Sequence, residues 1–162
     1  MTENRKIGSR KHSDLLMQYY FAYGSNLNWE QFHNRCPDAR MVCPAVLHGW
    51  RLAERQFADI EKDDESLVHG ALYAISPADL EMLDYYEGYP EGYTRQELPV
   101  VRKDGQLLMA LAYMMTPAWR RELEGVPYSR TYRQICSDGA AFWNIPDAFS
   151  SGEETFEKNC CQ

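Results

Sequence analysis

Hydrophobic residues occur in short runs separated by polar turns, a pattern typical of strands joined by loops and short helices. Residues 18–23 form an aromatic and apolar run, which predicts a buried strand. Two further apolar runs, residues 41–47 and 50–57, meet at His48-Gly49. They predict either a hairpin or a bent pair of strands.

The second half of the chain continues this alternation. Residues 59–66 are charged, and we expect a solvated surface loop there rather than a metal site. Residues 67–75 return to strand character. Asp104-Gly105, lying between apolar runs at 93–102 and 107–115, is the strongest hairpin signal in the chain.

Helices are predicted from their capping residues. Ser76, Pro77 and Asp79 give a cap, a proline at the first helical position and an acid in the first turn, and Gly88 can end that helix. Shorter helices are expected after Asn28 or Ser25, over residues 117–123, and after Ser129.

About six strands with short helices between them predict an α+β fold in which a mixed sheet curls into a small barrel. The 162 residues suffice for one domain, over residues 15–150. Residues 1–14 and 151–162 are polar, and we expect flexible tails there.

Composition excludes several classes of protein. A net charge of −7 lacks the basic footprint of a nucleic-acid binder, and no apolar run approaches the roughly 20 residues that span a bilayer. The cysteine count of 5 is odd and contains no Cys-x-x-Cys pair, so we expect free thiols and a cytoplasmic location. Nothing in the sequence fixes the oligomeric state, and a homodimer stays open.

The segment Tyr23-Gly24-Ser25-Asn26-Leu27 carries the first candidate chemistry. A glycine directly after a strand lets a ligand approach main-chain N–H groups, and the start of a helix leaves such groups unpaired. This arrangement suits an oxyanion or a carboxylate. An ordinary turn between a strand and a helix is the alternative.

Glu87 is the candidate for proton transfer. It lies at the C-terminal end of the helix that begins at Ser76, where the helix dipole disfavours a carboxylate. Neighbouring tyrosines over residues 85–93 would desolvate it, so we expect a raised pKa, as a general base near neutrality requires. The alternative is an exposed glutamate at a helix end.

Two tyrosines, Tyr23 and Tyr132, are candidates for donating phenolic hydrogen bonds into one pocket, although buried tyrosines are as often structural. Arg95 is expected to form a structural salt bridge. The histidines have no metal-ligand spacing, and no phosphate loop or dinucleotide fingerprint is present. We therefore expect neither a metal nor an organic cofactor.

Several of these motifs, taken in order, resemble the γ-glutamylcyclotransferase family. The resemblance covers roughly residues 18–140 and is carried by Tyr23-Gly24-Ser25-Asn26-Leu27, Arg35-Cys36-Pro37, Ala45-Val46-Leu47, Trp50-Arg51-Leu52-Ala53, Leu83-Asp84-Tyr85-Tyr86-Glu87-Gly88, Tyr93-Thr94-Arg95 and Pro127-Tyr128-Ser129-Arg130-Thr131-Tyr132.

The resemblance implies a small β-barrel flanked by helices and a γ-glutamyl amide as the substrate. It implies Glu87 as the catalytic acid and base, the loop from Tyr23 to Leu27 as the substrate loop, and Tyr132 near the substrate. The products would be 5-oxoproline and an amino acid or amine. The chain departs from the family's Pro-Ser-x-x-Tyr pattern by Tyr128, which stands between Pro127 and Ser129.

Two positions separate types within the family. Glutathione-specific members typically carry leucine where Asn26 stands, and γ-glutamylamine types usually carry threonine in place of Ser25. The presence of Asn26 and Ser25 in this chain therefore favours the classical type, which acts on γ-glutamyl amino acids. A γ-glutamylamine cyclotransferase, and a non-catalytic binding module with the same pocket, are the alternatives.

Overall fold

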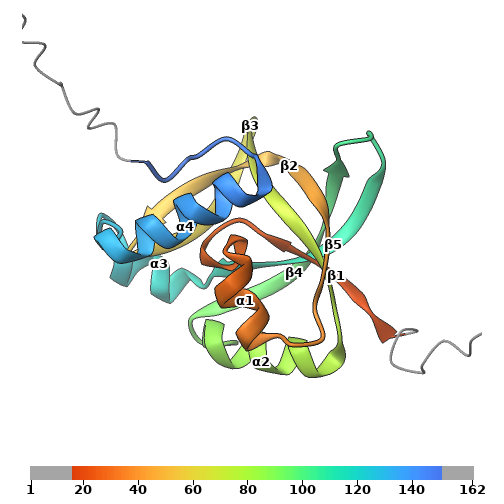
Figure 1. Cartoon of the computed structure of the whole chain (residues 1–162). Helices are drawn as coiled ribbons and strands as arrows, with labels where there is room; N and C mark the ends of the chain where they lie inside the picture. Colours follow the sequence, from red (N-terminus) through yellow and green to blue (C-terminus); the bar gives the residue numbers. More distant parts are fainter. Residues whose placement is uncertain (1–15, 151–162) are drawn as a thin grey trace, which may run out of the picture.

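The computed structural model describes residues 16–150, in which five strands close into a barrel with the order β1-β3-β2-β4-β5 (Figure 1). The predicted tails at 1–14 and 151–162 lie outside the described residues. The strands are β1 (Gln18–Ala22), β2 (Arg40–Arg55), β3 (Phe57–Ile75), β4 (Tyr93–Arg102) and β5 (Leu107–Met115). The α+β barrel in a single domain is confirmed.

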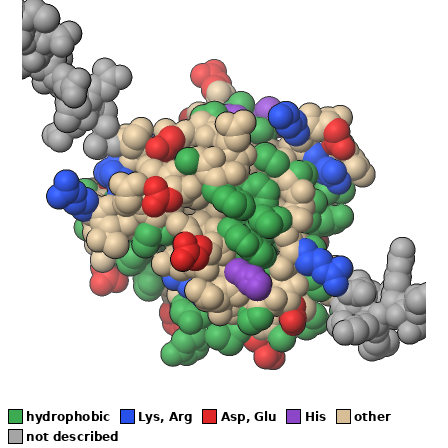
Figure 2. Space-filling model, viewed as in Figure 1, with side chains coloured by type: hydrophobic (Ala, Val, Ile, Leu, Met, Phe, Trp, Pro, Cys, Tyr) green, Lys and Arg blue, Asp and Glu red, His purple; other side chains and the backbone are tan. Residues whose placement is uncertain are grey.

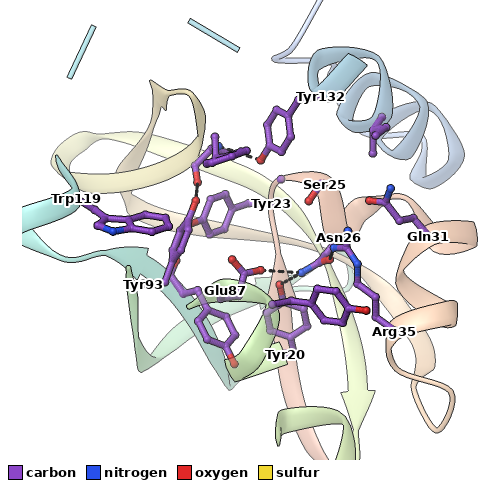
Figure 3. A pocket seen from close by; sticks show the side chains of 16 residues that line it. Tyr20, Tyr23, Ser25, Asn26, Gln31, Arg35, Glu87, Tyr93, Trp119 and Tyr132 are labelled. Carbon is purple, nitrogen blue, oxygen red and sulfur yellow. Dashed lines mark hydrogen bonds between the residues drawn. The ribbon is translucent and has the colours of Figure 1, made fainter. Parts of the chain in front are cut away.

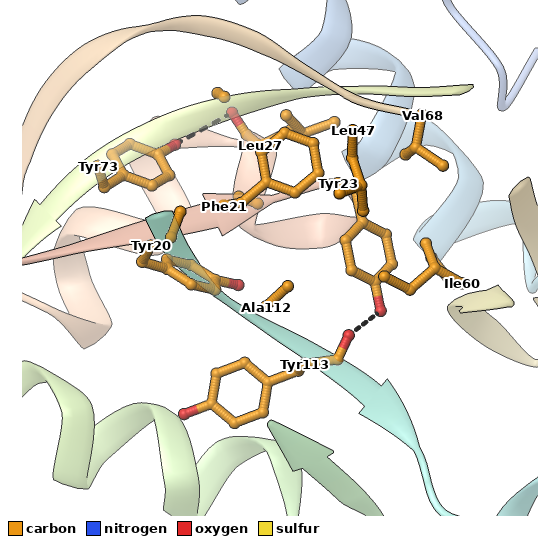
Figure 4. Close-up of a cluster of buried hydrophobic side chains, with 14 of the residues drawn as sticks. Tyr20, Phe21, Tyr23, Leu27, Leu47, Ile60, Val68, Tyr73, Ala112 and Tyr113 are labelled. Atoms are coloured by element: carbon orange, nitrogen blue, oxygen red, sulfur yellow. Dashed lines mark hydrogen bonds between the residues drawn. The ribbon is translucent and has the colours of Figure 1, made fainter. Parts of the chain in front are cut away.

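The aromatic run at the start of the chain forms β1, which closes the barrel. It pairs antiparallel with β3 and parallel with β5, where Tyr20 lies opposite Leu111. Inward side chains of several strands fill the interior, among them Phe21, Leu47 and Ile60, each at most 1% exposed (Figure 4). Burial of these apolar side chains is the main source of stability for the barrel.

The two runs around His48-Gly49 form one bent strand rather than a hairpin. β2 continues from Arg40 to Arg55, with a register shift between His48 and Trp50. Gly49 adopts φ 83°, which is open to glycine at low cost. The bulge bends the strand. The half before it pairs with both β3 and β4, and the half after it pairs with β3.

The expectation of a charged loop over residues 59–66 is wrong, because this segment is the first half of β3. β2 and β3 form a long hairpin that turns at Gln56. Opposite charges face each other across it, as Arg51 pairs with Glu61 and Arg55 with Asp59. Cross-strand ion pairs let a charged sequence remain in a sheet.

Helices α1, α2 and α4 begin after predicted capping residues, and α2 also ends at the predicted Gly88. They are α1 (Trp29–Arg35), α2 (Pro77–Glu87), α3 (Pro117–Leu123) and α4 (Arg130–Trp143), with a short 3-10 turn, η2 (Ser25–Leu27). The side chains of Asn28, Ser76 and Ser129 accept main-chain N–H bonds at the starts of α1, α2 and α4. Gly88 ends α2 in the left-handed conformation, with φ 64°.

Helix α4 packs directly on the turn η2. A Cβ atom on Gly139 of α4 would lie 2.6 Å from the main chain of Leu27 and Asn28. α1 and α2 lie next to each other below the barrel in Figure 1. The η2 turn is therefore held between β1 and α4, close to the end of α2.

Charges of both signs are scattered over the face shown in Figure 2, around a band of hydrophobic side chains. This face carries no extended field of positive charge of the kind that attracts nucleic acid. Over residues 16–150, none of the helices has the length and apolar character that crossing a membrane requires.

Candidate active site

A pocket of about 260 Å³ opens where η2, α1, the end of α2 and the start of α4 meet the barrel. Its size is near the lower end of the range for small-molecule sites, roughly 300 Å³. Half of the residues that line it are aromatic (Figure 3). The lining residues are Tyr20, Tyr23, Gly24, Ser25, Asn26, Gln31, Arg35, Phe57, Ala58, Tyr86, Glu87, Tyr93, Tyr113, Trp119, Tyr132 and Ile135.

Glu87 points into the middle of this pocket from the last residue of α2 (Figure 3). The side chain is half-buried, and desolvation raises the pKa of its carboxyl to about 7. The positive charge of Arg35 and a hydrogen bond from Asn26 act in the opposite direction and lower this pKa. A carboxyl that titrates near neutrality can both accept and return a proton.

The side chain of Asn26 connects the polar groups of the pocket. Its Nδ2 donates to Glu87 Oε1 at 3.2 Å and to the hydroxyl of Tyr20 at 2.9 Å. Its Oδ1 accepts from Arg35 Nη1 at 3.2 Å. Because these bonds use both ends of the amide, the orientation of Asn26 is fixed.

The main chain of η2 offers hydrogen-bond donors. The N–H groups of Leu27 and Asn28 bond back to the carbonyls of Gly24 and Ser25. The N–H groups of Ser25 and Asn26 precede these bonds and belong to the unpaired first turn of the helix. Ser25 and Asn26 are among the residues that line the pocket with Glu87.

Gly24 is required by its close neighbours and not by a left-handed backbone, because its φ is −120°. A Cβ atom here would lie 3.0 Å from both the Ala58 Cβ and the Tyr132 hydroxyl. Such contacts are tighter than normal packing, so a side chain at Gly24 would displace Tyr132.

The predicted tyrosines meet in this pocket, but their hydroxyls have protein partners. Tyr23 donates to the carbonyl of Tyr113 at 2.5 Å. The hydroxyl of Tyr132 accepts from the N–H of Ala58 at 2.9 Å, and Tyr93 donates to the carbonyl of Ala58 at 2.8 Å. Burial raises the pKa of all three phenols, which stay neutral near pH 7.

Leu27 is the predicted site residue that the fold keeps out of this pocket. Its side chain is fully buried in the core (Figure 4). Its carbonyl accepts hydrogen bonds from Trp143 Nε1 at 3.0 Å and from the Tyr73 hydroxyl at 3.5 Å. Leu27 holds the loop in place from behind, and its position gives no support to the expected contact with substrate.

Sequence reasoning assigned no role in the site to several lining residues, including Gln31, Arg35 and Trp119. Gln31 and Arg35 are four residues apart on α1, a spacing that puts two side chains on the same face of a helix. This spacing could have identified them. No local signal connects Trp119 of α3 to the site, because its position depends on how α3 packs.

Arg95 forms the structural salt bridge that was expected, and its partner is Asp84. Its Nε and Nη2 donate to the two carboxylate oxygens at 2.8 and 3.1 Å. Asp84 Oδ1 also accepts from the hydroxyl of Tyr113 at 2.7 Å. These contacts tie α2 to β4 and β5, and so fix the helix end that carries Glu87.

Residues 16–150 contain no cluster of three or more His, Cys, Asp or Glu side chains that could hold a metal ion. Cys36, Cys43 and Cys136 are free thiols. Cys160 and Cys161 lie outside the described residues.

The fold and the site together define a class. A small closed barrel holds a carboxyl with a raised pKa in a pocket that buried tyrosines and the η2 turn help to line. Such an arrangement has the features expected of a site for acid–base chemistry on a small polar ligand.

Comparison with known proteins gives the family. The family described as gamma-glutamyl cyclotransferase, AIG2-like, matches residues 20–134, and the chain belongs to it. The gamma-glutamylcyclotransferase of Homo sapiens is 30% identical over 156 residues, which cover 86% of this chain and 79% of the human one. The protein of the same name from Mus musculus is 28% identical over 153 residues, with the same two coverages.

Solved structures agree with this family. A structure titled gamma-glutamyl cyclotransferase is 29% identical, with a TM-score of 0.73 over 80% of this chain and 82% of its own. YkqA from Bacillus subtilis is 25% identical, with a TM-score of 0.67 over 82% of this chain and 51% of its own.

Proposed function

We propose that this protein is a γ-glutamylcyclotransferase. Its substrate would be a γ-glutamyl amino acid, whose α-amine attacks its own γ-carbonyl and releases 5-oxoproline and the free amino acid. The observation that carries the proposal is Glu87, a carboxyl with a pKa of about 7 in the middle of a pocket of suitable size. Support also comes from the family and from relatives of that name.

The reaction needs a base that later acts as an acid. The α-ammonium must lose a proton before it can attack, and Glu87 accepts it. After attack, the ring nitrogen loses a second proton while the leaving nitrogen must gain protons. Two protons thus pass from the attacking to the leaving nitrogen, and a carboxyl near its pKa can carry each in turn. The new C–N bond closes the lactam and the old C–N bond breaks.

The pocket would supply geometry as well as proton transfer. The nucleophile and the carbonyl belong to one molecule, so the enzyme must hold the glutamyl chain folded. The N–H groups of Gly24, Ser25 and Asn26 would bind the α-carboxylate or the developing oxyanion. The rings of Tyr23 and Tyr132 would limit the space for an extended chain.

Two residues bear on the type of substrate. Asn26 is the centre of the polar network, and leucine, which glutathione-specific members typically carry there, could make none of its hydrogen bonds. Ser25 stands where γ-glutamylamine types usually carry threonine. We therefore propose γ-glutamyl amino acids as the substrate class. The free thiols of Cys36, Cys43 and Cys136 support a cytoplasmic protein as part of the same proposal.

The test compares γ-Glu-Ala with its isomer α-Glu-Ala and measures 5-oxoproline and alanine. We expect 5-oxoproline and alanine to be released from the γ isomer alone. In the α isomer the α-amine is attached beside the scissile carbonyl, and its attack would close a three-membered ring. The α-carboxylate that the loop would bind is also used up in that isomer.

Glu87→Gln is the matched control, because the amide keeps the shape and cannot carry a proton. We expect the variant to lose at least ~100-fold in kcat. Release of alanine from both isomers, or of glutamate in place of 5-oxoproline, would identify a hydrolase. Binding of γ-Glu-Ala without any product would identify a binding module on this fold.

A further inference from the structure

Arg35 is a charged side chain of the pocket that the reaction described above does not use. It extends from the last residue of α1, half-buried, on the opposite side of Asn26 from Glu87 (Figure 3). Its guanidinium lies 4.8 Å from the ring centroid of Tyr86. Among residues 16–150, no carboxylate lies within salt-bridge distance of it.

The guanidinium is held in place and has donors to spare. One of its five N–H groups donates to Asn26 Oδ1, and the ring of Tyr86 supports its face. A planar fork of N–H groups matches a carboxylate in two-point contact. Arg35 acts on Glu87 only at a distance, through Asn26, so its remaining N–H groups are available to receive an anion from the ligand.

The space between Glu87 and Arg35 can accommodate one amino-acid unit. Both bond to the same amide at 3.2 Å, so the width of that amide, roughly 2 Å, puts their nearest polar atoms no more than about 9 Å apart. In an amino acid the nitrogen and the carboxylate oxygens are about 3 Å apart. A hydrogen bond of about 3 Å from the nitrogen to Glu87, and another from the carboxylate to Arg35, extend this to about 9 Å.

Two carboxylates of a γ-glutamyl amino acid could take this position, and burial favours one. Tyr23 and Tyr93, each 6% exposed, form the closed floor of the pocket, where the reacting glutamyl chain must be folded. Arg35 stands beside Tyr86, which is 50% exposed, at the open rim. The departing half of the substrate belongs at the rim, because it must leave and its side chain varies.

We propose that Arg35 binds the α-carboxylate of the leaving amino acid and thereby selects γ-glutamyl amino acids over γ-glutamyl amines. This inference rests on the proposed function. Glu87 transfers the proton to the leaving nitrogen, while Arg35 holds the carboxylate one carbon away. Arg35 is a specificity-determining residue, and its contact with Asn26 also orients the amide that bonds to Glu87.

The experiment compares γ-Glu-Ala with γ-Glu-alaninamide, which keeps the shape and removes the charge. 5-Oxoproline release gives kcat/KM for each. We expect the wild-type protein to prefer γ-Glu-Ala by about 10- to 100-fold, the range for a charge-assisted hydrogen bond. Arg35→Met should bring this ratio close to 1, and Arg35→Lys should restore part of it. Arg121→Met, which removes an exposed arginine of α3, should leave the ratio as in wild type.

The ratio separates the possible roles of Arg35. A merely structural role, or a contact with the glutamyl carboxylate that both substrates share, would lower both rates equally and leave the ratio unchanged. Either result overturns the inference but leaves the proposed function standing. Equal kcat/KM values of the wild-type protein for the two substrates would also overturn the inference and leave the proposed function standing. Failure of both substrates to give 5-oxoproline would overturn the proposed function, and this inference with it.

Discussion

The side-chain amide of Asn26 donates a hydrogen bond to Glu87 Oε1 at 3.2 Å, inside a pocket whose burial raises the pKa of Glu87 to about 7. The bond favours the charged carboxylate and so opposes desolvation. Asn26 itself is 4% exposed and is fixed by Tyr20 and Arg35. The proton affinity of Glu87 is therefore set by the balance between desolvation, which raises its pKa, and the charge of Arg35 together with this amide, which lower it.

The pH dependence of activity should reflect this balance. As a base, Glu87 must be ionised, so we expect kcat/KM of the wild-type protein to rise with pH through about 7. Asn26→Leu removes a donor that lowers the pKa, and the rise should move to higher pH. The measurement is kcat/KM for γ-Glu-Ala between pH 5 and 9, with Asn34→Leu on the exposed face of α1 as the control. A rise that stays in place or moves to lower pH would contradict this assignment.

Glu87→Gln should make the folded protein more stable at neutral pH while it removes activity. The carboxyl has a pKa of about 7 when folded and an ordinary value of 4.5, so the native state binds more protons between these values. Stability from this group is therefore present below about pH 4.5 and is lost as the pH rises to about 7.

The neutral amide of the Glu87→Gln variant avoids that loss. The free energy of unfolding of the variant should therefore equal that of the wild-type protein at pH 4.5. At pH values above 7.5, the variant should be more stable than the wild-type protein by about 1 to 3 kcal/mol. Urea unfolding of both proteins at these two pH values measures it. A variant that is less stable than wild type at pH 7.5 would show that the carboxylate is not desolvated.

Gly24→Val should impair substrate binding more than stability. The new side chain would enter the pocket wall, where even a Cβ atom lies 3.0 Å from the Tyr132 hydroxyl and the Ala58 Cβ. We expect KM for γ-Glu-Ala to rise at least ~10-fold, because the substrate loop and Tyr132 must separate. Gly24→Ala is the milder variant and should show a smaller rise in the same direction.

Ala118→Val, at an exposed position of α3, is the control for adding a β-branched residue. Normal KM in both Gly24 variants would mean that this loop is an ordinary turn and does not contact the substrate.

Activity should survive chelators. The proposed reaction needs a proton carrier and hydrogen-bond donors, which Glu87 and the main chain of η2 provide. We expect the same rate of 5-oxoproline release before and after dialysis against EDTA. A loss of activity that one divalent ion restores would reveal a site assembled from residues far apart in the sequence.

Local signals in the sequence determined the elements and the main candidate residue. Ser76 and Gly88 bound α2, and Asp104-Gly105 forms the turn of a hairpin, because capping and turn chemistry act over a few residues. The same locality put Glu87 at the end of a helix among tyrosines. Its raised pKa could be expected from the sequence, although the depth of its burial could not.

Only the tertiary structure decided which residues share the pocket and which charges are buried. Asp59 was expected in a solvated loop, yet it is fully buried because Arg55 and Arg120, from β2 and α3, both pair with it. Arg35 joins Glu87 through Asn26, and Leu27 turns away from them into the core. Propensities and caps depend on near neighbours in the chain, whereas burial and pairing depend on segments that meet only when the barrel closes.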